Sequence, residues 1–159
     1  METIKYQFDT QNHIGKSGEH YIDKWLRHTY KIIDVSCISR YQQAGIDRIV
    51  TRPDGSNVTL EYKVDFTAKR TGNIFFETVS NDKKKIPGWG WTSQADYWIF
   101  LIPKQELIIF KPGNLRNLVW GLKESLNKKI VPNTDYNTIG YPIPLKDARS
   151  ISFRSKCIS

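Results

Sequence analysis

Two carboxylates and one lysine, Asp47, Glu61 and Lys63, are the side chains whose types and spacing are best suited to chemistry. A close pair of carboxylates suits a hard, oxygen-seeking cation such as Mg²⁺, which polarises a phosphate and lowers the pKa of a bound water. A lysine beside the pair can orient or deprotonate that water, and can balance charge that develops on the phosphate. These residue types are therefore a minimal apparatus for hydrolysing a phosphodiester, provided that the fold brings them together.

The segments around these residues predict that they share one face of a sheet. Residues 57–66 alternate between apolar and polar side chains, so Glu61 and Lys63 fall on the same face, about 6–7 Å apart along the strand. The Arg-Pro-Asp-Gly sequence at residues 52–55 predicts a hairpin turn between this strand and the preceding one, which carries Asp47. Antiparallel pairing across that hairpin can bring Asp47 beside Glu61.

The acid-x-lysine motif is a weak signal without this context, because it occurs about once per chain of this size by chance. A second triplet, Asp82-Lys83-Lys84, lies in a polar segment with no strand pattern, and we interpret it as surface. For Glu61 and Lys63 the alternative interpretation is an ordinary solvent face with a cross-strand salt bridge.

Glu19 could add a carboxylate from the first predicted helix, residues 17–29. It falls near Ile22 and Leu26, at the edge of the apolar stripe of this helix, where an acid needs a partner or a chemical role. One hypothesis is that Glu19 completes a metal site. The alternative is that Glu19 is a favourable charge in the first turn of a helix that Ser17 caps.

Taken in order, these motifs resemble the PD-(D/E)XK nuclease superfamily, which includes restriction enzymes, Holliday junction resolvases, repair nucleases and small intron-encoded homing endonucleases. The resemblance covers about residues 15–110 and is carried by Gly15-Lys16-Ser17-Gly18-Glu19, Gly45-Ile46-Asp47 and Glu61-Tyr62-Lys63. The chain departs from the pattern at Ile46, where the proline of the family name would stand. The resemblance implies a mixed sheet flanked by helices, Asp47 and Glu61 as metal ligands, and Lys63 as the catalytic lysine. Glu19 would be the helix acid that many members use.

The composition points to a polyanion as partner. The formal net charge is +8 and the pI about 9.5, which favours nucleic acid, although a well-solvated basic surface is the alternative. Hydrophobic residues make up 39% and charged residues 25% of the 159 residues, as is typical of a globular protein. The sequence shows no signal peptide or membrane span, so we expect an intracellular, cytoplasmic protein. Cys37 and Cys157 are expected to be free thiols, because their spacing fits no zinc site.

Basic residues that follow the predicted catalytic strand are the candidates for DNA contacts. A lysine run leads into a loop with Trp89 and Trp91 that could track a phosphate backbone, but a solvated lysine run followed by packed tryptophans fits equally well. Gln94 could contact the nucleophilic water or DNA. Glu77 could point toward the same cleft. The predicted phosphate contacts are Lys69, Arg70, Lys83, Lys84 and Lys85.

The order of these elements predicts an α/β or α+β domain over residues 1–159, with a mixed central sheet flanked by helices. The predicted helices and strands cover residues 17–29, 32–38, 46–51, 57–66, 74–79, 95–102, 106–110 and 112–126. Residues 128–159 are expected to form an irregular C-terminal extension with a last strand near residues 151–153.

From these features we expect a Mg²⁺-dependent endonuclease, with Mn²⁺ as a possible substitute, that acts site-specifically on double-stranded DNA in the manner of a homing or restriction enzyme. Cutting both strands needs two active sites, so a homodimer or homotetramer is expected. A Holliday junction resolvase or a repair nuclease of the same fold is the nearest alternative. A non-catalytic nucleic-acid-binding protein and an RNA-binding module are the alternatives from other classes.

Overall fold

The computed structural model describes the backbone over residues 2–158 and the side chains of residue 13 and residues 15–158. Within this part of the chain, the larger sheet has six strands in the order β1 (Lys31–Asp34), β2 (Arg48–Thr51), β3 (Asn57–Val64), β6 (Tyr97–Ile102), β7 (Glu106–Phe110) and β10 (Arg154–Cys157). The smaller sheet has the order β5 (Ile86–Pro87), β4 (Asn73–Asn81), β9 (Asn137–Pro144) and β8 (Lys129–Pro132). The helices are α1 (Glu2–Leu26), α2 (Ser39–Gln43), α3 (Ala68–Thr71), α4 (Trp89–Thr92), α5 (Pro112–Leu122) and α6 (Leu145–Ser150).

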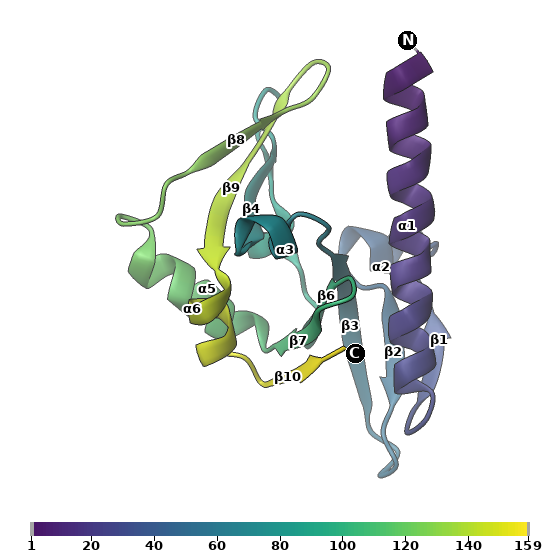
Figure 1. The fold of residues 1–159 in the computed structure, drawn as a ribbon. Helices are drawn as coiled ribbons and strands as arrows, with labels where there is room; N and C mark the ends of the chain where they lie inside the picture. The colour runs from purple at the N-terminus through teal and green to yellow at the C-terminus, as the bar shows by residue number, and fades with distance from the viewer. Residues whose placement is uncertain (1, 159) are drawn as a thin grey trace.

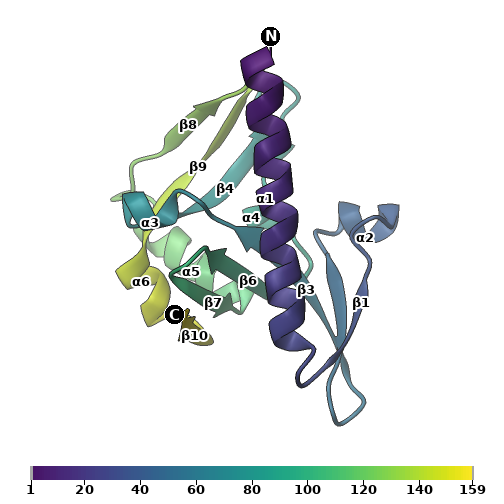
Figure 2. The same cartoon turned by 45° about the vertical axis from the view of Figure 1, so that its right-hand side comes forward.

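The larger sheet is mixed, because β3 pairs with β6 in parallel while its other pairings are antiparallel. Helix α1 lies across one face of this sheet, and α5, α6 and the smaller sheet lie on the other side (Figures 1 and 2). The predicted fold class, a mixed central sheet flanked by helices, is therefore confirmed. The predicted strands and the second predicted helix are found, with shifted ends, as β1, β2, β3, β4, β6, β7 and α5.

Two hydrophobic clusters fill the two faces of the larger sheet. The cluster beneath α1 joins Ile22 and Leu26 of the helix to Leu60 and Tyr62 of β3. The other cluster joins the opposite side chains of β6 and β7 to α5 and the smaller sheet, with Trp98 at its centre. The alternation predicted for β3 is confirmed, and it leaves Glu61 and Lys63 on the face away from α1.

The predicted hairpin between β2 and β3 is present. The Gly55 amide donates to the Arg52 carbonyl oxygen at 2.9 Å, and Gly55 has a φ of +85°, which glycine adopts without steric cost. Asp54 Oδ1 accepts the Ser56 amide at 2.9 Å and holds the turn. This turn fixes the register that pairs Arg48 with Leu60.

The predicted start of the first helix is wrong, since α1 begins at Glu2 rather than Ser17. Ser17 is therefore not an N-cap, and Glu19 does not lie in a first helical turn. Gly18 allows close packing of this helix against the sheet. A Cβ atom on Gly18 would lie 2.7 Å from a Val64 methyl carbon and 3.2 Å from Leu101.

The expectation of an irregular segment over residues 128–159 is also wrong. This segment contains β8, β9, α6 and β10, and the last strand lies at residues 154–157 rather than 151–153. Strand β9 pairs with β4, and β10 pairs with β7, so both strands depend on partners far away in the sequence. The Arg149 guanidinium pairs with buried Glu106 and ties α6 to β7. Of the helices in the described part of the chain, none combines the length and the apolar character that a membrane span requires.

Replacing Gly18 tests the close contact between α1 and β3. Gly18→Ala should lower the free energy of unfolding by about 1–3 kcal/mol, because the new methyl group has to displace stiff β-branched Val64. Gly15→Ala is the matched control, since nothing lies within 4 Å of its added Cβ atom. It should stabilise the helix by up to about 1 kcal/mol. Urea unfolding measures both changes, and equal effects of the two variants would contradict the packing shown.

Candidate functional site

Glu61 and Lys63 form an ion pair in the middle of the larger sheet. Their partners on parallel β6 are Trp98 and Phe100, so both charged groups lie over the buried aromatic cluster. Lys63 Nζ lies 2.5 Å from Glu61 Oε1 and 4.6 Å from the centre of the Trp89 ring. Glu61 is only 4% exposed. The predicted neighbourhood of the acid and the lysine is thus confirmed, but on a covered face rather than an open one.

The second carboxylate oxygen of Glu61 lacks a partner. Oε2 is buried and accepts no hydrogen bond from any described residue. Buried polar atoms are nearly always satisfied, and an exception calls for an ion, a water or a chemical role to explain it. A carboxylate oxygen suits a hard cation, since it is the ligand that Mg²⁺ prefers.

Asp47 lies where the pairing of β2 and β3 ends. Arg48, the first residue of β2, pairs with Leu60 of β3. Asp47 comes just before Arg48 in the chain, and Glu61 comes just after Leu60. The Asp47 Oδ2 atom accepts the Tyr62 amide at 2.7 Å, and the Asp47 amide donates to the Leu60 carbonyl at 2.8 Å. The hairpin thus attaches Asp47 to the backbone on either side of Glu61, as the strand pattern predicted.

Arg48, which the sequence analysis did not single out, is the centre of a charge cluster on the α1 side of the sheet. It is 3% exposed. Its guanidinium donates to Asp23 at 3.0 Å, Glu19 at 3.1 Å, Asp34 at 3.0 Å and the Asp47 carbonyl oxygen at 3.1 Å. Burial opposes the charged guanidinium, but the hydrogen bond and attraction to Asp23 outweigh it, so the pKa of Arg48 is raised. Arg48 thereby fixes the backbone of Asp47 to α1.

Tyr62 completes this cluster from β3. Its hydroxyl donates to Asp23 Oδ1 at 2.9 Å, and its ring lies 5.0 Å from the Arg48 guanidinium carbon. Burial, reinforced by the negative charge of Asp23, raises the pKa of Tyr62, so the hydroxyl stays protonated and acts as a donor. The cluster therefore joins α1, β1, β2 and β3 through buried polar contacts.

Glu19 lies in this cluster, where it pairs with Arg48. It is half-buried, and burial raises the pKa of its carboxyl; Arg48 opposes the shift and nearby Asp47 adds to it. The proximity to Asp47 is in line with the hypothesis of a helix acid beside the site. The Glu19 contact in this structure is nevertheless an ion pair with Arg48, and its alternative role in a first helical turn is excluded.

Glu77 approaches the site from β4 of the smaller sheet. Its Oε1 atom accepts the Trp89 amide at 3.2 Å. Burial raises the pKa of Glu77; the Trp89 hydrogen bond and the positive charge of Lys63 oppose the shift, and the negative charge of Glu61 adds to it. Glu77 is therefore close enough to Glu61 and Lys63 for their charges to affect its pKa, and the suggestion that it points toward the same cleft stays a prediction.

Arg116 on α5 is a residue of the site that sequence reasoning missed. It donates to the carbonyl oxygens of Gly90 at 2.7 Å and Ser93 at 2.6 Å, and its guanidinium faces the Trp98 ring at 5.1 Å. Burial lowers the pKa of Arg116, while the charge of Glu61 acts in the opposite direction. An arginine in the middle of an amphipathic helix carries no distinguishing signal in the sequence.

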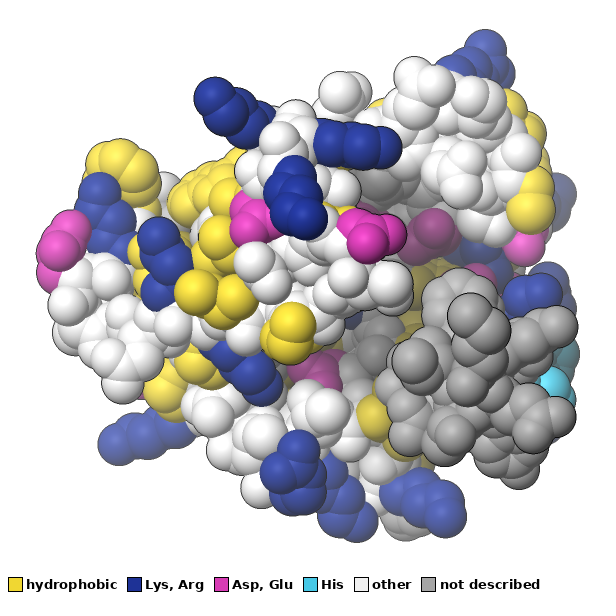
Figure 3. Space-filling model, turned by 90° about the horizontal axis from the view of Figure 1, so that it is seen from above, with side chains coloured by type: hydrophobic (Ala, Val, Ile, Leu, Met, Phe, Trp, Pro, Cys, Tyr) yellow, Lys and Arg dark blue, Asp and Glu magenta, His cyan; other side chains and the backbone are white. Residues whose placement is uncertain are grey.

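The predicted DNA contacts are exposed but lie apart. Lys69 and Arg70 are on α3, directly after β3, whereas the lysines at residues 83–85 are in the turn between β4 and β5. Gln94 is exposed, and its amide donates to the Ala44 carbonyl oxygen at 2.8 Å. Seen from above, Lys and Arg side chains are spread over the face, and acidic side chains lie among them both near the middle and at the edges (Figure 3).

The two tryptophans of the predicted basic loop differ in environment. Trp89 packs into the aromatic cluster, with its ring 5.1 Å from that of Trp98, so the interpretation as a packed tryptophan holds for this residue. Trp91 is 40% exposed and touches Phe76 edge-on. The second acid-x-lysine triplet is structural: Asp82 accepts the backbone and side-chain N–H groups of Asn137, each at 2.8 Å.

No group of three or more His, Cys, Asp or Glu residues stands ready to hold a metal ion among the side chains that the structure describes. Comparison of the chain with protein-family models, with curated proteins and with solved structures gives no match. The resemblance to the PD-(D/E)XK superfamily therefore stays a prediction from the sequence motifs.

Breaking the Arg48 cluster should destabilise the fold. Arg48→Met leaves the buried Asp23 carboxylate without its cation, and should lower the free energy of unfolding by about 3–5 kcal/mol. Asp34→Asn is the control: Asp34 contacts the same guanidinium but its side chain is 57% exposed, so a loss of at most about 1 kcal/mol is expected. Denaturant unfolding near neutral pH measures the free energy of unfolding of both variants. Equal losses in the two would contradict the account.

Neutralising Glu77 should stabilise the protein in a pH-dependent way. Because the folded pKa of Glu77 lies above its ordinary value of 4.5, the ionised carboxylate destabilises the fold above the folded pKa. This cost disappears as the pH falls through the folded pKa toward the unfolded value. Glu77→Gln, whose amide oxygen can still accept the Trp89 amide, should raise the unfolding temperature near pH 8 but not near pH 4. The exposed Glu124→Gln is the control, and a larger gain at the lower pH would refute the assignment.

Proposed function

We propose that this protein is a divalent-metal-dependent endonuclease that hydrolyses phosphodiester bonds in double-stranded DNA. The observation that carries the proposal is the buried Oε2 atom of Glu61, which has no hydrogen-bond partner among the described residues, in the carboxylate that pairs with Lys63. A buried carboxylate with one free oxygen and one neighbouring cation is a costly arrangement for a purely structural role. Its cost is understandable if the free oxygen receives a cation during function.

Mg²⁺ fits these residues, with Mn²⁺ as a substitute. Glu61 and Asp47 would hold the ion, and such ions are often bound by one or two carboxylates together with waters and substrate phosphate oxygens. When bound, the ion would polarise the phosphate and make a bound water more acidic.

Lys63 supplies the positive charge of the site. Its ammonium group is held between Glu61 and the face of the Trp89 ring, so few orientations are open to it. In this position it can donate a hydrogen bond to a non-bridging phosphate oxygen, or hold the attacking water for proton removal. The hairpin attaches Asp47 to the backbone of the strand that carries this pair, and Arg48 holds the Asp47 carbonyl oxygen.

The electrostatics of the chain support a nucleic-acid substrate. The net charge of +8 favours a polyanion, and the exposed cations Lys69 and Arg70 follow directly after the strand that carries Glu61 and Lys63. The order of the motifs, which resembles the PD-(D/E)XK pattern, supports the same assignment. Cleavage of both strands would bring two copies of the site together, as a homodimer or homotetramer.

Cleavage of DNA by single-residue variants tests the proposal. The wild type should nick or linearise a mixture of plasmid and genomic DNA in the presence of Mg²⁺ or Mn²⁺. Glu61→Gln and Lys63→Met should each lower the rate by about 10²-fold or more, because each removes a group that acts on the reacting phosphate. Lys146→Met is the matched control, since this lysine lies exposed on α6 and is not among the proposed DNA contacts.

Three results would overturn the proposal. One is wild-type protein that binds DNA but cuts none of it with either ion. Another is cleavage that survives Glu61→Gln and Lys63→Met at the wild-type rate, which would locate the activity elsewhere. The third is an equal loss in Lys146→Met, which would mean that the effect comes from the loss of any positive charge.

A further inference from the structure

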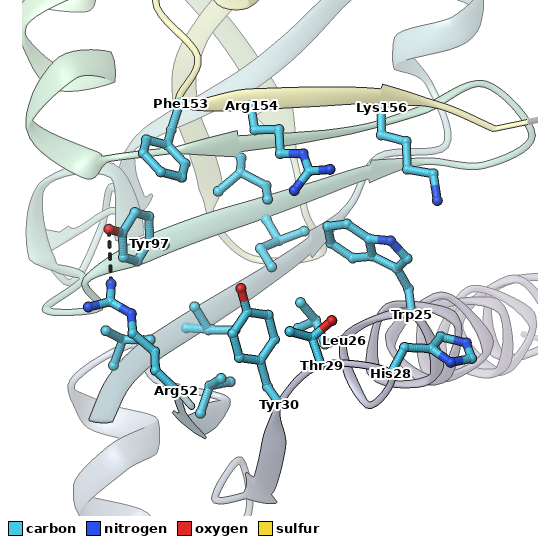
Figure 4. A pocket seen from close by; sticks show the side chains of 15 residues that line it. Trp25, Leu26, His28, Thr29, Tyr30, Arg52, Tyr97, Phe153, Arg154 and Lys156 are labelled. Atoms are coloured by element: carbon cyan, nitrogen blue, oxygen red, sulfur yellow. Dashed lines mark hydrogen bonds between the residues drawn. The ribbon is translucent and has the colours of Figure 1, made fainter. Parts of the chain in front are cut away.

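We propose that a groove between the end of α1 and β10 binds a short stretch of single-stranded nucleic acid. The groove has a volume of about 470 Å³ and opens on the α1 face of the larger sheet (Figure 4). Its floor includes Leu60, whose side chain points away from the face of Glu61 and Lys63. The groove is therefore a site distinct from the proposed catalytic site, and it does not depend on the nuclease activity.

Aromatic rings line the groove on several sides. Trp25 and Tyr30 come from the end of α1 and the following loop, and Tyr97 and Phe153 come from β6 and the residue before β10. Phe153 is 58% exposed, although its ring lies 5.4 Å from that of Tyr97. Rings around an apolar floor provide stacking surfaces for bases of any sequence.

Cations lie along the same groove. Arg52, Arg154 and Lys156 are among its lining residues, and none of its lining residues, all of which are described, is acidic. No ion pair among the described residues uses these cations. Figure 4 shows the Arg154 side chain pointing into the groove and Lys156 above Trp25, with 5.5 Å between the Lys156 ammonium group and the ring centre. The positive charge is thus available to phosphates.

A second, shallower hollow continues the groove beyond Tyr97. It shares Arg52, Val58 and Tyr97 with the first and adds Lys111, together with Asp96, whose carboxylate accepts hydrogen bonds from Thr59. Arg52 donates to the Tyr97 hydroxyl at 3.3 Å, so this pair marks the junction between the two hollows. A track with rings and cations in succession suits a strand of several linked nucleotides better than one small anion.

Charge favours nucleic acid over the other occupants of an apolar groove. A second copy of this chain carries a net charge of +8 and would meet the basic groove with like charge. An acidic peptide would pair with the cations, but its carboxylates would not stack on aromatic rings on several sides of the groove. A duplex is too wide to place its stacked bases against the floor, whereas unpaired bases can reach it.

Binding without metal isolates this site from cleavage. A short fluorescein-labelled oligothymidylate is titrated with the full chain in EDTA, and anisotropy reports the affinity. Phe153→Ala and Arg154→Gln, both at exposed positions that should not affect folding, should each weaken binding by about fivefold or more. Trp120→Ala and Lys146→Gln are matched controls, because they remove an exposed ring and an exposed cation outside the groove and should leave affinity unchanged.

Photo-crosslinking locates the bound strand directly. An oligothymidylate substituted with 5-iodouracil should crosslink to Trp25, Tyr30, Tyr97 or Phe153, as peptide mass spectrometry can show. Lys63→Met should retain both the affinity and the crosslinks, so a failed nuclease proposal would leave this result intact. Crosslinks that map only to other residues, or an equal loss in the Trp120→Ala control, would overturn the inference. So would tighter binding of polyglutamate than of the oligothymidylate.

Discussion

Burial of the Glu61 carboxylate is the constraint on which the arrangement of this protein depends. An ionised carboxylate inside a protein needs a partner for each oxygen, and removing such a partner costs several kcal/mol. Here Lys63 satisfies one oxygen, and the other has no donor among the described residues. The surroundings must therefore hold an unfavourable group in place, and the proposed cation would relieve its cost.

Several distant segments share that task. The hairpin joins Asp47 to the strand of Glu61, and Arg48 ties the same backbone to α1 through Asp23. The smaller sheet brings Glu77 to the other side of Lys63, and α4 places the Trp89 ring against the ammonium group. Fold stability and site geometry thus rely on the same contacts, since any shift of β3 against α1 would disturb both.

The sequence predicted what depends on local pattern. Strand alternation placed Glu61 and Lys63 on one face, and the turn residues at 52–55 predicted the hairpin that carries Asp47. Contacts with residues distant in the sequence were not predictable from local pattern. The Arg48 cluster joins residues of α1 and β1, and Arg116 reaches the site from α5.

The close packing at Gly18 and the strands of the C-terminal segment escaped prediction for a related reason. Gly18 packs closely on Val64, a tertiary contact that helix propensity does not register. Strands β8, β9 and β10 are rich in polar residues and prolines, and they form because β4 and β7 offer edges to pair with. Local composition could not reveal those edges.

An anomalous-scattering experiment on crystals soaked in Mn²⁺ tests the central claim most directly, because it locates the ion without relying on activity. The account predicts a peak beside Glu61 Oε2 and the Asp47 carboxylate, at about 2.2 Å from the oxygens, the distance expected for a hard cation. Glu61→Gln crystals should lose this peak. A map in which Mn²⁺ binds only elsewhere, while Glu61 keeps its pair with Lys63 and its second oxygen is met by a protein donor, would contradict the account.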